Sequence, residues 1–111
     1  MAGHRLDEKG RFCIVVALTA GSNNPERRAR QDAQGSRLGL TRAEIDAARR
    51  GFSFDFCTSK AIALALASDE ATRERRRHEA IRAGIDNLAC AEIERMAAKL
   101  LAPPFAKRTQ Q

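Results

Sequence analysis

Three cysteines and two histidines are the residues of this chain that could supply a nucleophile, a base or metal ligands. Cys13, Cys57 and Cys90 are far apart in sequence, and His4 and His78 are isolated. An odd count without a close pair argues against a disulfide framework and against a zinc site, so we expect no metal and no cofactor. Each thiol has apolar or alanine-rich neighbours, which predicts a small buried side chain. Cys57 is the alternative redox thiol, because it falls near the predicted start of a helix, where a thiolate is stabilised.

The chain is basic, with a net charge of +6 over 111 residues. Such a charge permits binding to nucleic acid, to a membrane surface or to an acidic partner, and it demonstrates none of them. No apolar run approaches the ~20 residues needed to span a bilayer, and the N-terminus lacks a secretory pattern. We therefore expect no membrane insertion, and a cytoplasmic location is the default.

The first element that would position these residues is an apolar run over residues 12–18. Val15 and Val16 favour a buried strand, whereas the charged residues that precede the run favour a helix N-terminus. We predict a helix from Asp7 to about Ala20.

A second, very polar helix is predicted over residues 26–38. Asn24 suits its N-cap, Pro25 suits its first position, and Gly39 suits the left-handed position after its end. Exposure to solvent is the ordinary interpretation of such a helix, and a basic lining for a pocket or a subunit interface is the alternative. The bases that support either interpretation are Arg27, Arg28, Arg30 and Arg37.

The middle of the chain contains the clearest local signals. Thr41 and Glu44 form a capping box at the start of a helix, and Gly51 lies just beyond its end. Residues 52–56 alternate three Phe with polar residues, and we interpret them as an extended turn whose rings fill a helix junction; a stacking platform for bases is the alternative. Residues 61–67 are apolar nearly all round, which predicts the central buried helix of the domain.

Start and stop signals in the last third of the chain predict two more helices, over about residues 69–83 and 88–101, separated by a turn at Gly84. The first carries many charges, with expected pairs Glu74–Arg77 and Glu79–Arg82. The second has a predicted apolar stripe that comprises Leu88, Ile93, Met96, Ala97, Leu100 and Leu101.

Taken together, these patterns predict a single all-α domain over residues 1–111, a bundle of about six helices. Five Phe without Trp or Tyr fit packed helices better than a sandwich. Residues 1–5 and 106–111 are expected to be loose termini. A chain of this size has limited surface to bury alone, which favours a homo-oligomer.

The order of these features resembles the alkylhydroperoxidase D-like / carboxymuconolactone decarboxylase-like family over nearly the whole chain. The resemblance implies the all-α fold of that family and, for its peroxidase branch, a Cys-x-x-Cys-x-x-x-His motif with a Glu one helix earlier. The shared positions are Leu6-Asp7-x-Lys9-x-Arg11, Gly21, Gly39-Leu40-Thr41-x-x-Glu44-Ile45, Arg50-Gly51, residues 60–67 and Phe105-x-x-Arg108.

All four catalytic positions of the family are substituted in this chain. In the register that the resemblance implies, the Glu falls on Phe12, the two Cys fall on Asn24 and Arg27, and the His falls on Gln31. None of these side chains can act as a thiol nucleophile or as a base near neutral pH. The decarboxylase branch also keeps the His that Gln31 replaces. The resemblance therefore implies the fold and argues against both known chemistries.

We favour a degenerate member of this family that acts as a binding or structural oligomeric module. The first alternative is an oxidoreductase or a small-acid-converting enzyme with a relocated site, so whether the chain is an enzyme stays open. Its pocket, lined by Asn24, Arg27 and Gln31, would bind a small acidic ligand, and Cys13 would supply a new thiol.

The second alternative is a nucleic-acid binder that uses the last two predicted helices as a helix-turn-helix. Glu92 and Glu94 near the start of the second helix oppose it, because a reading helix faces phosphates there. Nucleic acid is therefore not the partner that we expect.

Overall fold

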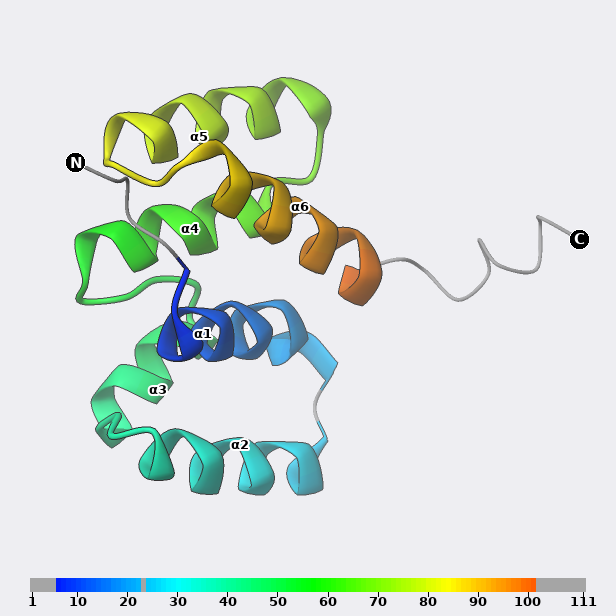
Figure 1. Cartoon of the computed structure of the whole chain (residues 1–111). Coiled ribbons are helices and arrows are strands. Elements are labelled where there is room, and N and C mark those ends of the chain that lie inside the picture. Colours follow the sequence, from blue (N-terminus) through cyan, green and yellow to red (C-terminus); the bar gives the residue numbers. More distant parts are fainter. Residues whose placement is uncertain (1–5, 23, 102–111) are drawn as a thin grey trace, which may run out of the picture.

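The structure is a computed structural model that describes residues 6–22 and 24–101, and over these residues it contains six α-helices and no strand (Figure 1). The all-α prediction is confirmed, and residues 12–18 are helical. The predicted loose termini and the Phe105-x-x-Arg108 similarity lie outside the described residues. The elements are α1 (Glu8–Thr19), the 3₁₀ turn η1 (Ala20–Ser22), α2 (Pro25–Arg37), α3 (Arg42–Arg49), α4 (Phe56–Leu66), α5 (Glu70–Arg82) and α6 (Asn87–Leu101).

Side-chain caps fix where most of these helices begin. The predicted capping box is present, with the Glu44 N–H donating to Thr41 Oγ1 at 3.1 Å and the Thr41 N–H donating to Glu44 Oε1 at 2.7 Å. Gly39 follows α2 with φ +91°, the left-handed conformation that was predicted there. At the starts of the other helices, a side-chain oxygen accepts the N–H three residues later; the residues that do so are Asp7, Asn24, Asp55, Asp69 and Asp86.

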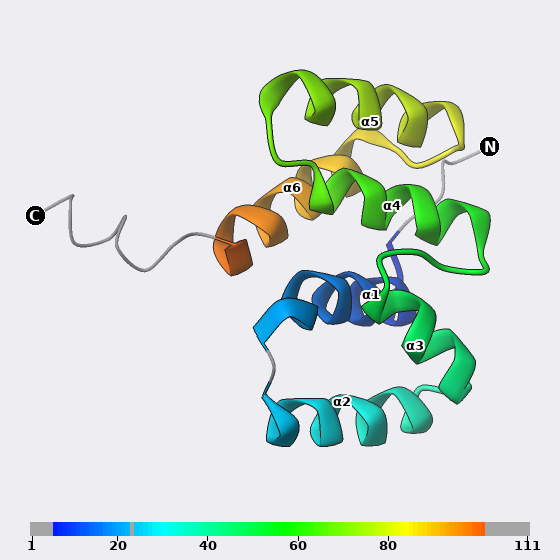
Figure 2. The same cartoon turned by 180° about the vertical axis from the view of Figure 1, so that it is seen from behind.

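Two apolar helices, α1 and α4, lie side by side in the middle of the molecule (Figures 1 and 2). Ile14 of α1 and Ile62 of α4 are completely buried, and Ile93 of α6 packs in the same cluster. As predicted, α4 is central: it packs against α1, α5 and α6. No helix within the described residues is long and apolar enough to cross a membrane.

The second helix is attached to the outside of this core through a glycine. Gly35 is the one buried residue of α2. A Cβ atom at this position would lie 2.6 Å from Ile45 Cδ1 of α3 and 3.0 Å from Phe12 Cε2 of α1. Only a residue without a side chain therefore allows α2 to come this close to both helices.

Two sequence predictions about apolar side chains are wrong. The rings of residues 52–56 do not fill a helix junction, because Phe54 and Phe56 are 65% and 64% exposed. The loop that carries them runs along the outside of α4, where the Ser53 N–H donates to Ser59 Oγ at 3.3 Å. Leu88 is 81% exposed, because the buried face of α6 consists of Ala89, Cys90 and Ile93 instead.

The contact at Gly35 generates a prediction about stability. The substitution Gly35→Leu should lower the free energy of unfolding by about 1–3 kcal/mol, because the new side chain has no room between Ile45 and Phe12. Urea unfolding followed by circular dichroism measures this change. The matched control is Ser36→Leu, which places the same side chain on an exposed neighbouring position of α2. Equal stability of the two variants would show that α2 does not need the close approach.

Candidate functional site

A groove of about 570 Å³ lies between α1, α2 and the C-terminal part of α6. Its large apolar side chains come from α1 and α6, whereas α2 contributes almost all of its polar side chains. A volume of this size suits a small organic molecule. The residues that line it are Phe12, Val15, Thr19, Arg27, Arg30, Gln31, Ala33, Gln34, Arg37 and Leu100.

Hydrogen bonds hold the polar side of this groove in place. Gln31 Nε2 donates to Thr19 Oγ1 at 3.0 Å, and this hydroxyl donates to the Val15 carbonyl at 2.8 Å. Arg27 Nη1 donates to Ser22 Oγ at 3.0 Å. These bonds connect α2 to the C-terminal end of α1 and to η1, and they orient the side chains of Arg27 and Gln31.

A smaller pocket of about 190 Å³ continues from the groove, since it shares Thr19, Arg27 and Gln31 with it. It adds Arg28 and Arg49 to the polar lining. The Arg49 side chain is 11% exposed; it contacts Asp32 at 2.9 Å and donates to the Arg28 carbonyl at 3.1 Å. Its charge is therefore compensated within the protein.

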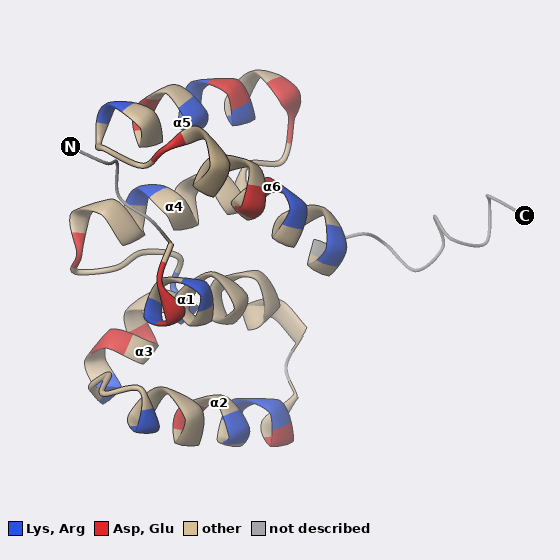
Figure 3. Cartoon of the chain, viewed as in Figure 1, with Lys and Arg blue, Asp and Glu red and all other residues tan. Residues whose placement is uncertain are grey.

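The charges of the groove itself are not compensated in this way. Among the described residues, no carboxylate lies within 4.0 Å of the guanidinium groups of Arg27, Arg30 or Arg37. Basic residues occur along the length of α2 (Figure 3). Guanidinium groups beside apolar side chains favour a ligand that carries a carboxylate or phosphate on an apolar body.

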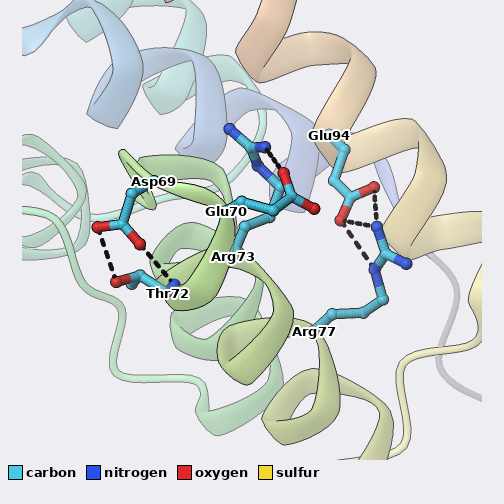
Figure 4. A network of polar contacts seen from close by, with 6 residues as sticks. All are labelled: Asp69, Glu70, Thr72, Arg73, Arg77 and Glu94. Atoms are coloured by element: carbon cyan, nitrogen blue, oxygen red, sulfur yellow. Dashed lines mark hydrogen bonds and ion pairs between the residues drawn. The ribbon is translucent and has the colours of Figure 1, made fainter.

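The cleft between α5 and α6 is larger, about 720 Å³, but its charges are paired. Figure 4 shows Arg77 facing Glu94, with Nε and Nη2 of the guanidinium donating to the carboxylate at 2.9 and 2.6 Å. Arg73 contacts Glu70 at 2.8 Å in the same cleft. The expected pair Glu74–Arg77 is therefore wrong, because Arg77 binds the carboxylate of α6. An anion would have to displace these carboxylates, so the cleft is the weaker anion site.

The acidic residues of α6 also bear on the helix-turn-helix alternative. Glu92 contacts Arg11 of α1 at 2.6 Å, and this guanidinium holds the pKa of Glu92 below its ordinary value. Glu94 is bound to Arg77 of α5. Both carboxylates thus connect α6 to neighbouring helices and place negative charge on the helix that would read DNA.

Three of the four positions that the family resemblance identifies lie together in the groove. Phe12, Arg27 and Gln31 line it, on two different helices. Asn24 does not, because it caps α2: its Oδ1 accepts the Arg27 N–H at 3.1 Å.

The cysteines lie elsewhere. Cys13 is buried and lines a separate pocket beside Lys9 and Glu44, so it does not share a site with Arg27. Burial, reinforced by Glu44 and other nearby carboxylates, raises the pKa of the Cys13 thiol to about 11. Cys90 is buried, and burial also raises its pKa. The prediction of small buried side chains is confirmed for these two thiols.

Cys57 differs from the other two thiols. It is the second residue of α4, near the helix start as predicted, and it is partly exposed. Its Sγ donates to the Ala83 carbonyl at 3.4 Å.

The sequence interpretation named Arg30 and Arg37 among the bases of a possible pocket lining, but it missed Gln34. Starting from Arg27, each of residues 30, 31, 34 and 37 lies three or four positions after another member of the set, which places all five on one side of a helix. That periodicity was available from the sequence once α2 was assigned. Leu100 carried no comparable signal, because its approach to the groove depends on how α6 crosses α1.

Comparison with known proteins adds no assignment: no protein-family model, no curated protein and no solved structure matches this chain. Within the described residues there is also no group of three or more His, Cys, Asp or Glu side chains that could hold a metal ion.

The thiol environments generate a prediction about reactivity. In the native protein at pH 8, a disulfide reagent such as 5,5′-dithiobis(2-nitrobenzoate) should modify one thiol per chain, Cys57, because Cys13 and Cys90 are buried and protonated. The other two should react after denaturation. In the variant Cys57→Ser, the native reaction should disappear. Rapid native modification of Cys13 would instead show an accessible thiolate and restore the relocated redox site.

Proposed function

We propose that this protein is a binding module that takes a small organic anion into the groove between α1 and α2. The observation that carries the proposal is the set of three guanidinium groups, Arg27, Arg30 and Arg37, that face an apolar wall without a carboxylate partner among the described residues. The ligand class is a carboxylate or phosphate ester with an aliphatic or aromatic body.

The polar and apolar parts of the groove give the ligand an orientation. Arg27 and Gln31, held by Ser22 and Thr19, would receive the acidic group at the end where the smaller pocket continues. The apolar body would contact Phe12 of α1. Both ends of the ligand would contribute to affinity. The acidic group would replace water in a charged hydrogen bond to the guanidinium, and the apolar body would leave water on contact with Phe12.

The side chains that line the groove can bind a ligand, but few of them could catalyse a reaction. Among the described residues that line it, Thr19 has the one hydroxyl, and its hydrogen is directed to the Val15 carbonyl. The described part of the lining includes no Cys, His or carboxylate. A nucleophile and a base are therefore missing from the described lining, which supports binding over catalysis.

The resemblance to alkylhydroperoxidase D-like proteins also supports the groove between α1 and α2 as the ligand site. Three positions that it matches with the catalytic residues of that family line this groove. We propose that the chain keeps the ligand pocket of such a protein and has replaced its thiol chemistry by recognition through Arg27 and Gln31.

Octanoate and octan-1-ol test this proposal as matched probes that differ in their polar group. Isothermal titration of the full chain should detect octanoate binding and much weaker octan-1-ol binding. The substitution Arg27→Ala should weaken octanoate binding about tenfold, the effect of losing one charged hydrogen bond. Added salt should weaken it further, because the contact is electrostatic.

The control variant is Arg75→Ala, which removes one exposed arginine from α5 and changes the net charge equally. It should leave the affinity within twofold of wild type. Equal binding of the two probes, or equal losses in the two variants, would contradict a specific anion site at Arg27.

A further inference from the structure

Four exposed apolar side chains gather around the loop between α3 and α4. Phe52 and Leu66 are each 39% exposed, and Phe54 and Phe56 are exposed by 65% and 64%. With ~200 Å² for a fully exposed large side chain, these fractions correspond to roughly 400 Å² of apolar surface. A patch of this size on a small protein marks an interaction surface.

We call these four side chains the Phe patch. The rings of Phe52 and Phe54 meet edge to face with centroids 6.0 Å apart. The chain then returns along α4, and Figure 2 shows this loop beside the helix, ending at the first residue of α4, Phe56. At the C-terminal end of α4, Leu66 lies close to Gly51, the residue that precedes Phe52: a Cβ atom added to Gly51 would be 3.2 Å from Leu66 Cδ1.

Hydrogen bonds hold the loop so that the rings stay outside. The Ser53 N–H donates to Ser59 Oγ at 3.3 Å, and the Asp55 N–H donates to Ser53 Oγ at 3.0 Å. The Asp55 carboxylate caps α4 by accepting the Thr58 N–H at 2.8 Å. The patch is therefore presented by an ordered loop, which lowers the entropy cost of binding to it.

The charges in and around the Phe patch favour a second copy of this chain. Its one cation in contact with a ring is Lys60, whose Nζ lies 5.3 Å from the Phe56 ring centroid. The patch carries both a cation and aromatic rings, so it is complementary to a second copy of itself. Aromatic side chains such as Phe are enriched in protein–protein interfaces. A nucleic acid would require more cations among the rings than this patch provides.

We propose that the protein forms a symmetric dimer through the Phe patch. A two-fold axis would place the rings of one copy against those of the other, and would bring Lys60 of each copy to the aromatic side chains opposite. The patch supplies about half of the ~800 Å² per partner that a stable interface needs, and the flanking Arg50 and Asp55 belong to the polar rim. This proposal assigns a surface to the oligomer that the chain length favours, and it is independent of the anion groove.

Sedimentation equilibrium over a concentration series tests the dimer. The wild-type chain of 12.2 kDa should approach twice that mass as concentration rises. Phe54→Asp should raise the dimer dissociation constant by roughly tenfold or more, because it places a carboxylate at the centre of the interface. Phe56→Ser is a second, milder variant, and circular dichroism confirms that each variant folds.

Leu88→Asp is the matched control, since it makes the same change at the most exposed large apolar side chain, on α6. It should dimerise as wild type does. A wild-type chain that stays at 12.2 kDa, or a Phe54→Asp chain that dimerises equally well, overturns the proposal. A monomer whose Phe54 instead mediates binding to anionic vesicles or to a single-stranded oligonucleotide also overturns it. Octanoate affinity in Phe54→Asp should be unchanged, which separates this test from that of the groove.

Discussion

The packing of α1 against α4 is the contact on which the rest of the structure depends. Each helix has a stretch without charge, residues 12–18 and 61–67, and neither stretch could be exposed to water without a large loss of stability. Burial of a side chain such as Ile14 or Ile62 contributes about 1.5–3 kcal/mol. Three further helices pack on this pair: α3 packs on α1, while α5 and α6 pack on α4. The ion pair between Arg11 and Glu92 then joins α6 to α1 at the surface, where such pairs add little stability.

The second helix has a different relation to this core, and the candidate function follows from that difference. It is too polar to be buried, and it reaches the core only where Gly35 meets Ile45 and Phe12. Beyond this contact, α2 extends alongside α1 and leaves the groove between them. Arg27, Arg30 and Arg37 have no carboxylate within 4.0 Å among the described residues, so they can bind an anion without first breaking an ion pair. The ligand site is thus a consequence of holding a charged helix against an apolar one through a glycine contact and a few hydrogen bonds, without burying it.

The sequence predicted those features that depend on neighbouring residues. The capping box at Thr41 and Glu44 was predicted correctly because a helix N-terminus needs acceptors three residues apart, which is a local requirement. The exposure of Phe54 was predicted wrongly, because an alternating pattern does not determine whether a loop runs through the core or along its outside. Of the groove, Arg27 and Gln31 were available from the family resemblance and Arg30 from helical spacing. Leu100 was not, since it meets α1 only after the whole chain has folded.

The central claim, that an anion binds between α1 and α2, is tested most directly by locating the bound probe. Backbone amide signals of the ¹⁵N-labelled chain can be followed by NMR during a titration with octanoate. The account predicts that the largest shifts occur at Arg27, Gln31 and Thr19, and that they saturate with one common affinity. Shifts confined to residues 52–56, or centred on Arg73 and Arg77 in the cleft between α5 and α6, would contradict it and would assign the ligand to a different surface.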